Sequence, residues 1–121
     1  MASTVGTGQL LTDISNAMVA LHKEQFGRGP TRARASFAGP DILICTLEDV
    51  LLPAERALVD MGQQERVRES RLFMQVATRD RFIATLESIV GRQVMSFVSA
   101  SDPDRDVVYE ICEFVPVNDA V

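Results

Sequence analysis

The sequence predicts an α+β domain in which an antiparallel four-stranded sheet packs against a long helix. Two pairs of strand-like segments, each pair joined by a turn-rich connection, lie on either side of a long central segment that contains neither glycine nor proline. The chain has 121 residues, which fits one domain. Two hairpins with separate helices are typical of the α+β class, and the expected order is α-β-β-α-α-β-β.

The first helix is expected over residues 9–26. Gly27 follows it, and glycine is the usual left-handed residue just beyond a helix end. The residues before it (1–8) and the last ones (117–121) are expected to be loose ends of a single domain. The apolar residues of this first helix recur at helical spacing: Leu10, Leu11, Ile14, Met18 and Leu21.

The first hairpin is expected to join residues 31–37 to residues 42–47. In the first of these segments Arg32 and Arg34 alternate with small or apolar residues, so the two arginines lie on one face of a strand. The intervening Gly39-Pro40-Asp41 has the composition of a turn. The second segment is apolar on both faces, which is typical of an inner strand.

A short helix is expected to begin at Pro53, where the missing N–H costs nothing, with Glu55 in its first turn. A long helix is expected over residues 63–90, with Leu72 and Val76 in its apolar stripe. At 1.5 Å per residue it spans about 42 Å, more than a globule of this size. It must therefore either kink around residues 78–80 or protrude and pack against a second copy of the chain.

The last two strands are expected over residues 93–99 and 107–115, joined by the polar segment 100–106. Asp102, Asp104 and Asp106 have the spacing of a calcium-binding loop, with Glu113 at its twelfth position. However, Val107 stands where such a loop needs glycine. We therefore expect a solvated acidic turn and no metal site.

Composition excludes several classes of function. The net charge of −5 and a pI near 4.8 argue against general nucleic-acid binding, which needs a concentrated basic surface. No apolar run approaches the ~20 residues of a membrane-spanning helix, and residues 1–6 do not resemble a signal peptide, so we expect a cytoplasmic protein that does not insert into membranes. Cys45 and Cys112 are expected to be reduced and buried.

No pattern of catalytic or cofactor-binding residues is present, so no catalytic residue and no cofactor are assigned. The only histidine, His22, is expected to be a partly exposed polar residue. The charged residues of the long helix are expected to form a solvated face: Arg66, Arg68, Glu69, Arg71 and Asp80.

The candidate binding residues are basic and follow the first helix. Arg28, Gly29, Arg32 and Arg34 combine free backbone amides with guanidinium groups, which suits an anion or an acidic partner. Glu55 is added because it shapes the entry to the neighbouring helix. The alternative interpretation of the same residues is a helix stop, a turn and a solvated strand face.

Read together, these segments resemble a small bacterial family known as MpsC-like. The family name implies association with a Na⁺-translocating membrane-potential-generating system linked to cation or bicarbonate transport, in which a chain of this kind is an accessory component. The resemblance covers nearly the whole chain and rests on Gly27-Arg28-Gly29-Pro30, Leu52-Pro53-Ala54-Glu55, Gly91-Arg92-Gln93-Val94, and Phe97-Val98-Ser99 with Asp102 and Asp106.

We therefore expect an accessory or regulatory binding module that self-associates, as a dimer, and that has a membrane-transport protein as a possible partner. The apolar side chains Leu72, Phe73 and Val76 would be buried in the self-association. Two alternatives remain at this point. One is a small enzyme that acts on an anionic substrate through arginines and a carboxylate such as Glu55, and the other is a purely structural oligomer.

Overall fold

The computed structural model describes the backbone of residues 2–117 and the side chains of residues 6–117. It confirms the α+β class and the expected order of elements. These are α1 (Ala2–Phe26), β1 (Arg32–Ala38), β2 (Ile42–Glu48), α2 (Pro53–Asp60), α3 (Gln64–Val90), β3 (Val94–Asp102) and β4 (Val107–Phe114).

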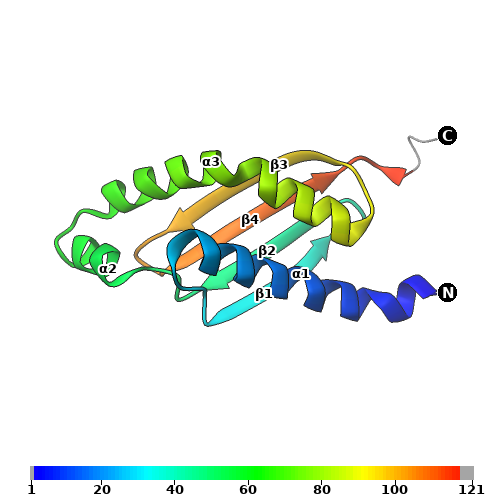
Figure 1. The fold of residues 1–121 in the computed structure, drawn as a ribbon, viewed down its shortest axis with the longest axis horizontal. Coiled ribbons are helices and arrows are strands. Elements are labelled where there is room, and N and C mark those ends of the chain that lie inside the picture. The colour runs from blue at the N-terminus through cyan, green and yellow to red at the C-terminus, as the bar shows by residue number, and fades with distance from the viewer. Residues whose placement is uncertain (1, 118–121) are drawn as a thin grey trace.

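The four strands form one antiparallel sheet in the order β1-β2-β4-β3, so each hairpin supplies one inner and one edge strand. Both α1 and α3 lie on the same face of this sheet, with α1 over β1 and α3 over β3 (Figure 1). The predicted packing of the sheet against the long helix is confirmed, and α1 covers the same face beside it. The apolar stripe of α1 also needs burial, and the sheet is wide enough for two helices.

Helix α3 is uninterrupted through residues 78–80, where a kink was one of the two expectations. Its N-terminal part reaches past the end of the sheet and lies beside α2 (Figure 1). At its other end Gly91 has a φ of 74° and donates its N–H to the carbonyl of Glu87 at 2.8 Å. A left-handed glycine therefore ends the helix, as the sequence predicts.

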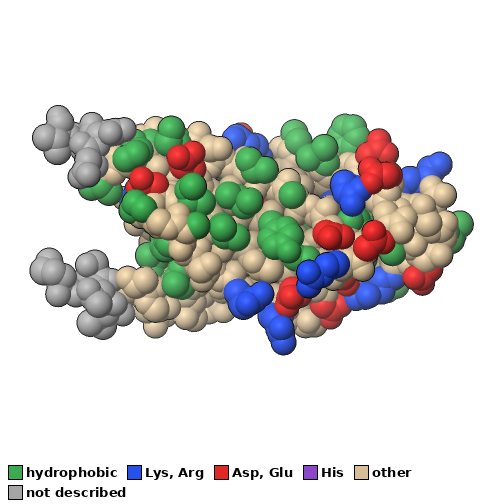
Figure 2. Space-filling model, turned by 180° about the vertical axis from the view of Figure 1, so that it is seen from behind, with side chains coloured by type: hydrophobic (Ala, Val, Ile, Leu, Met, Phe, Trp, Pro, Cys, Tyr) green, Lys and Arg blue, Asp and Glu red, His purple; other side chains and the backbone are tan. Residues whose placement is uncertain are grey.

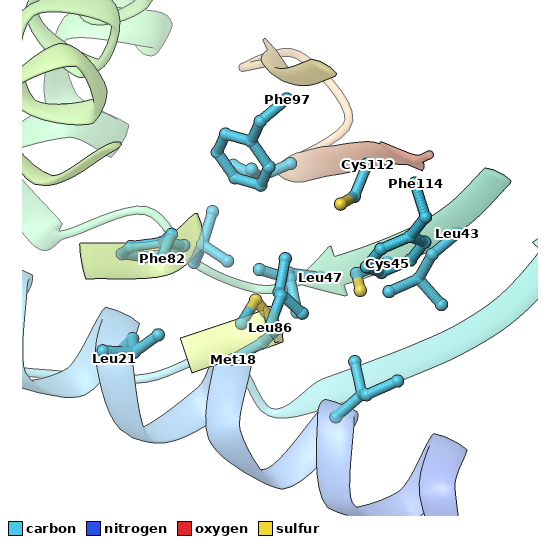
Figure 3. Close-up of a cluster of buried hydrophobic side chains, with 13 residues drawn as sticks. Met18, Leu21, Leu43, Cys45, Leu47, Phe82, Leu86, Phe97, Cys112 and Phe114 are labelled. Atoms are coloured by element: carbon cyan, nitrogen blue, oxygen red, sulfur yellow. The ribbon is translucent and has the colours of Figure 1, made fainter. Parts of the chain in front are cut away.

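The core lies between the two helices and the sheet, and every element except α2 contributes to its centre or its margin (Figure 3). Strand alternation sends every second side chain of β2 and β4 into this layer. The buried cluster comprises Ile14, Met18, Leu21, Leu43, Cys45, Leu47, Val50, Phe82, Leu86, Phe97, Val108, Cys112 and Phe114.

Two boundaries differ from the sequence prediction by more than one residue. Helix α1 begins at Ala2 rather than at residue 9, although Gly6 and Gly8 weaken helix propensity in its first turns. Strand β3 continues to Asp102, because β4 pairs with it as far as Val107, the partner of Asp102. Of the expected loose ends, residue 1 and residues 118–121 lie outside the described part of the chain.

Candidate functional site

The structure separates the predicted binding residues into two groups. Arg28 is half-buried and donates from Nη1 to the carbonyl of Leu51 at 2.8 Å and from Nη2 to Asp49 at 3.3 Å. It thereby ties the end of α1 to the segment that leads into α2. Its guanidinium is committed to the fold, so the anion-binding role predicted for it is not favoured.

Gly29 is needed for close packing against α1. A Cβ atom at this position would lie 3.1 Å from the carbonyl oxygen of Val19 and 3.2 Å from the Cγ1 of the same residue. Either distance is shorter than an ordinary van der Waals contact. The glycine therefore permits the chain to return across the helix towards β1, which is a structural role.

Arg32 and Arg34 lie on the face of β1 that points away from the helices, as the alternation predicts. Arg32 forms an ion pair with Glu48 of β2 at 3.3 Å. Arg34 is also exposed, but its side chain has no hydrogen bond or ion pair within the described part of the chain. Of the predicted basic residues, Arg34 alone keeps a free guanidinium.

A polar junction joins the β3–β4 turn to the segment between β2 and α2. The Oδ1 atom of Asp106 accepts the backbone N–H groups of Val50 at 2.8 Å and Leu51 at 2.9 Å, while the carbonyl of Asp106 accepts the N–H of Asp49 at 3.0 Å. Asp49 and Asp106 have φ values of 59° and 57°. Aspartate tolerates this left-handed conformation better than most residues, which suits both turns.

Arg56 of α2 bridges the two aspartates of this junction, with Nη2 at 2.6 Å from Asp106 and also in contact with Asp49. A hydrogen bond from the side chain of Thr31 is the main cause that lowers the pKa of Asp49, and Arg28 and Arg56 lower it further. The carboxylate is therefore held in its charged form by groups that belong to the fold.

Glu55 serves the start of α2 and not an open binding surface. Its Oε1 accepts the N–H of Leu52 at 2.8 Å, which caps the helix. The same carboxylate binds Arg71 of α3 in a bidentate manner, with Nε to Oε2 at 2.9 Å and Nη2 to Oε1 at 2.7 Å. Both oxygens of Glu55 are thus occupied.

Arg71 is buried, with 1% of its surface exposed, so its predicted place on a solvated face was wrong. It also donates to the carbonyl of Val50 at 3.0 Å, and its guanidinium carbon lies 4.3 Å from the centre of the Phe26 ring. Since it contacts α1, the segment before α2, and α2 itself, Arg71 holds three parts of the chain together. Arg71 lies one helical turn after Val67 on α3, and Val67 is also buried.

A second buried polar group lies between α1 and the sheet. His22 Nδ1 is 3.0 Å from the carbonyl of Met18, and Nε2 is 3.2 Å from Oε2 of Glu110, whose other oxygen accepts the hydroxyl of Ser99. A carbonyl can only accept a hydrogen bond, so Nδ1 donates to the carbonyl of Met18. His22 and Glu110 are 2% and 1% exposed. The prediction of a partly exposed histidine was wrong.

The cysteines are free and buried, as predicted. Burial raises the pKa of Cys45 to about 12, with the charge of Glu110 as the next cause, and burial raises the pKa of Cys112 to about 11. Neither thiol is therefore activated as a nucleophile.

The acidic turn does not bring its carboxylates together. Asp106 faces the junction, Asp104 accepts the side-chain amide of Gln64 at 2.9 Å, and Asp102 accepts the N–H of Arg105 at 3.4 Å. Within residues 2–117 no group of three or more potential ligands is arranged to hold a metal ion.

The residues that sequence reasoning missed are Arg71, Asp49, Arg56 and Glu110. For two of them the sequence contained a pattern that indicates burial. Glu110 has the same strand parity as Cys112 and Phe114, which point into the core, and Arg71 lies one turn after Val67. Asp49 and Arg56 carried no such signal, because their partners Arg28 and Asp106 lie in distant parts of the sequence.

None of the described helices is long and apolar enough to cross a bilayer. Comparison with curated proteins and with solved structures gave no significant match. The sequence model of one family matches residues 6–115, nearly the whole chain, and that family is described as a Na⁺-translocating membrane potential-generating system (MpsC). The resemblance noted in the sequence is thereby confirmed, and the chain belongs to the MpsC family.

Proposed function

We propose that this chain is a cytoplasmic accessory module that self-associates as a dimer and acts beside a membrane system linked to cation or bicarbonate transport. The family description supports the association with a Na⁺-translocating membrane potential-generating system. The observation that carries the self-association is the outward face of α3. On this face the exposed fraction is 78% for Phe73, 66% for Val76 and 55% for Leu72.

These three side chains belong to one surface. Positions 69, 72, 73, 76 and 80 follow the spacing i, i+3, i+4, i+7 and i+11, which keeps them on one side of a helix. The buried residues Val67 and Arg71 lie on the opposite side of α3. Large apolar side chains in a continuous exposed patch are typical of a protein–protein interface.

The charges beside this patch suit a second copy in antiparallel orientation. If Leu72 packs beside Val76 of the second copy, the two-fold axis passes beside Met74. Glu69 then faces Arg79 of the second copy, since both are equally far from position 74 along the helix. Glu69 and Arg79 are exposed, and neither has an ion-pair partner within residues 6–117. The α3 surface is therefore complementary to itself.

The sheet face that the helices leave uncovered is a second apolar surface (Figure 2). Val98 and Ile111 lie on it and are 52% and 36% exposed, less than the side chains of the α3 surface. Charged residues gather towards the α2 end of this face (Figure 2). Because Val98 is apolar and exposed and lies on the sheet face away from α3, it provides a matched control for substitutions in the proposed interface.

Replacing Phe73 with serine is expected to convert the dimer to a monomer, because Phe73 is the most exposed large side chain of the α3 surface. Light scattering across a concentration series measures the mass. Val98→Ser removes an exposed apolar side chain outside the α3 surface and should leave the dimer intact. Equal loss of mass in both variants would argue against the α3 interface, and a monomeric parent protein would refute it.

The enzyme alternative, with Glu55 as the catalytic carboxylate, is less well supported. Both oxygens of Glu55 are engaged by Arg71 and by the N–H of Leu52. A carboxylate held in this way positions α2 and is poorly placed to exchange protons with a substrate. The purely structural oligomer differs from our proposal only in lacking a further partner.

A further inference from the structure

A groove of about 580 Å³ lies along β1, on the opposite edge of the sheet from β3. One wall comes from α1, with Leu11, Thr12, Ser15 and Asn16. The other comes from residues 33–36 of β1. The groove is open to solvent and follows four consecutive residues of a strand, so it suits an extended chain better than a compact small molecule.

The backbone of β1 is available along this groove. Strand β1 ends the sheet order β1-β2-β4-β3, so only one of its sides is paired. Alternate residues of an edge strand present N–H and C=O groups to an added strand. The opposite edge differs, because Arg68 donates to the carbonyl of Ser101 in β3 at 3.4 Å. Within residues 6–117 no side chain makes a hydrogen bond to the backbone of β1.

The side chains that line the groove leave room for a second chain. Ala33 and Ala35 are small and half-buried. From α1, Leu11 supplies an apolar contact, and the side chains of Ser15 and Asn16 have no hydrogen-bond partner in the described part of the chain. Together they combine an apolar floor with polar groups that can bind the side chains or backbone of an added strand.

The positive charge of Arg34 favours one kind of added strand over another. Arg34 is one of the residues that line the groove, but its side chain leaves β1 on the face away from the helices, with its guanidinium unpaired. Arg32 on the same face is paired with Glu48. Antiparallel pairing of β1 with β1 of a second copy around residue 33 would place Arg32 opposite Arg34 twice, which is unfavourable. A strand with acidic side chains instead places carboxylates beside Arg34.

We propose that the groove between α1 and β1 binds an extended acidic segment of a partner protein, which adds to β1 as a fifth strand. This gives the binding module a defined partner chemistry and uses a surface separate from the exposed face of α3. Loss of the dimer and loss of this binding are therefore distinguishable.

The test uses a fluorescent capped peptide of about nine residues that alternates valine with glutamate, and a matching valine–lysine peptide. The acidic peptide is expected to bind the full chain with saturation below about 1 mM, and the basic one is not. Arg34→Ala should weaken binding at least about tenfold, while the matched variant Arg32→Ala should change it less than about twofold. Hydrogen exchange of the β1 amides should slow on binding.

Ser15→Trp fills the groove and should abolish binding without changing the mass in solution or the thermal unfolding temperature. Equal effects of Arg32→Ala and Arg34→Ala would show diffuse attraction and overturn the proposal. So would the absence of binding at about 1 mM, or unchanged exchange in β1. If Ser15→Trp instead converts a dimer to a monomer, a second copy occupies the groove and the peptide proposal is wrong.

Discussion

Replacing Glu55 with glutamine is expected to lower the free energy of unfolding by about 3–5 kcal/mol. Glutamine keeps the shape of the side chain, but it leaves the guanidinium of Arg71 without a negative partner at a position that is 1% exposed. It also weakens the cap on the N–H of Leu52. A loss of this size is a large part of the total stability of about 5–15 kcal/mol of a typical domain.

Urea unfolding followed by circular dichroism measures this loss. Asp60→Asn is the matched control, since it neutralises an exposed carboxylate on the same helix and should change stability by less than about 0.5 kcal/mol. If Glu55→Gln costs less than about 1 kcal/mol, the ion pair with Arg71 is not what holds α2 in place.

Replacing His22 with leucine is expected to cost a similar amount, about 3–5 kcal/mol. The carboxyl group of Glu110 would keep only the hydroxyl of Ser99, at a site where 1% of the residue is exposed. Stability then depends on the pair and not on either residue alone. The double variant His22→Leu/Glu110→Leu should therefore be more stable than the sum of the two single losses implies.

A double-mutant cycle, measured by urea unfolding, quantifies the interaction between His22 and Glu110. A coupling energy of roughly 1–3 kcal/mol is expected for residues in one buried network. Additive losses would contradict the account, because they would show that histidine and glutamate contribute only by filling space.

Much of the fold follows from local patterns in the sequence. The glycine after each long helix, the alternation of Arg32 and Arg34, and Pro53 followed by Glu55 each act within a few residues, so the elements they define appear where expected. The boundary of β3 could not be predicted in this way. It depends on how far β4 continues to pair with it, which is a property of two segments.

The candidate site was predicted less well, and the reason is physical. Charged residues were assigned to a solvated surface, yet Arg71 is buried because Glu55 and the ring of Phe26 compensate it. Arg28 appeared free in the sequence, but its partner Asp49 lies beyond β2. Such pairs form only when distant segments pack, so sequence spacing identifies neither partner. Arg34 was the exception, because its alternation alone placed it on an open face.

The most direct test of the central proposal, self-association through α3, is the mass in solution of a charge-swapped pair of variants. Glu69→Arg should give a monomer of 13.3 kDa, because it would face Arg79 of the second copy. Glu69→Arg/Arg79→Glu restores opposite charges and should return the mass to twice that value. A double variant that stays monomeric, or a single variant that stays dimeric, would contradict the antiparallel α3 interface.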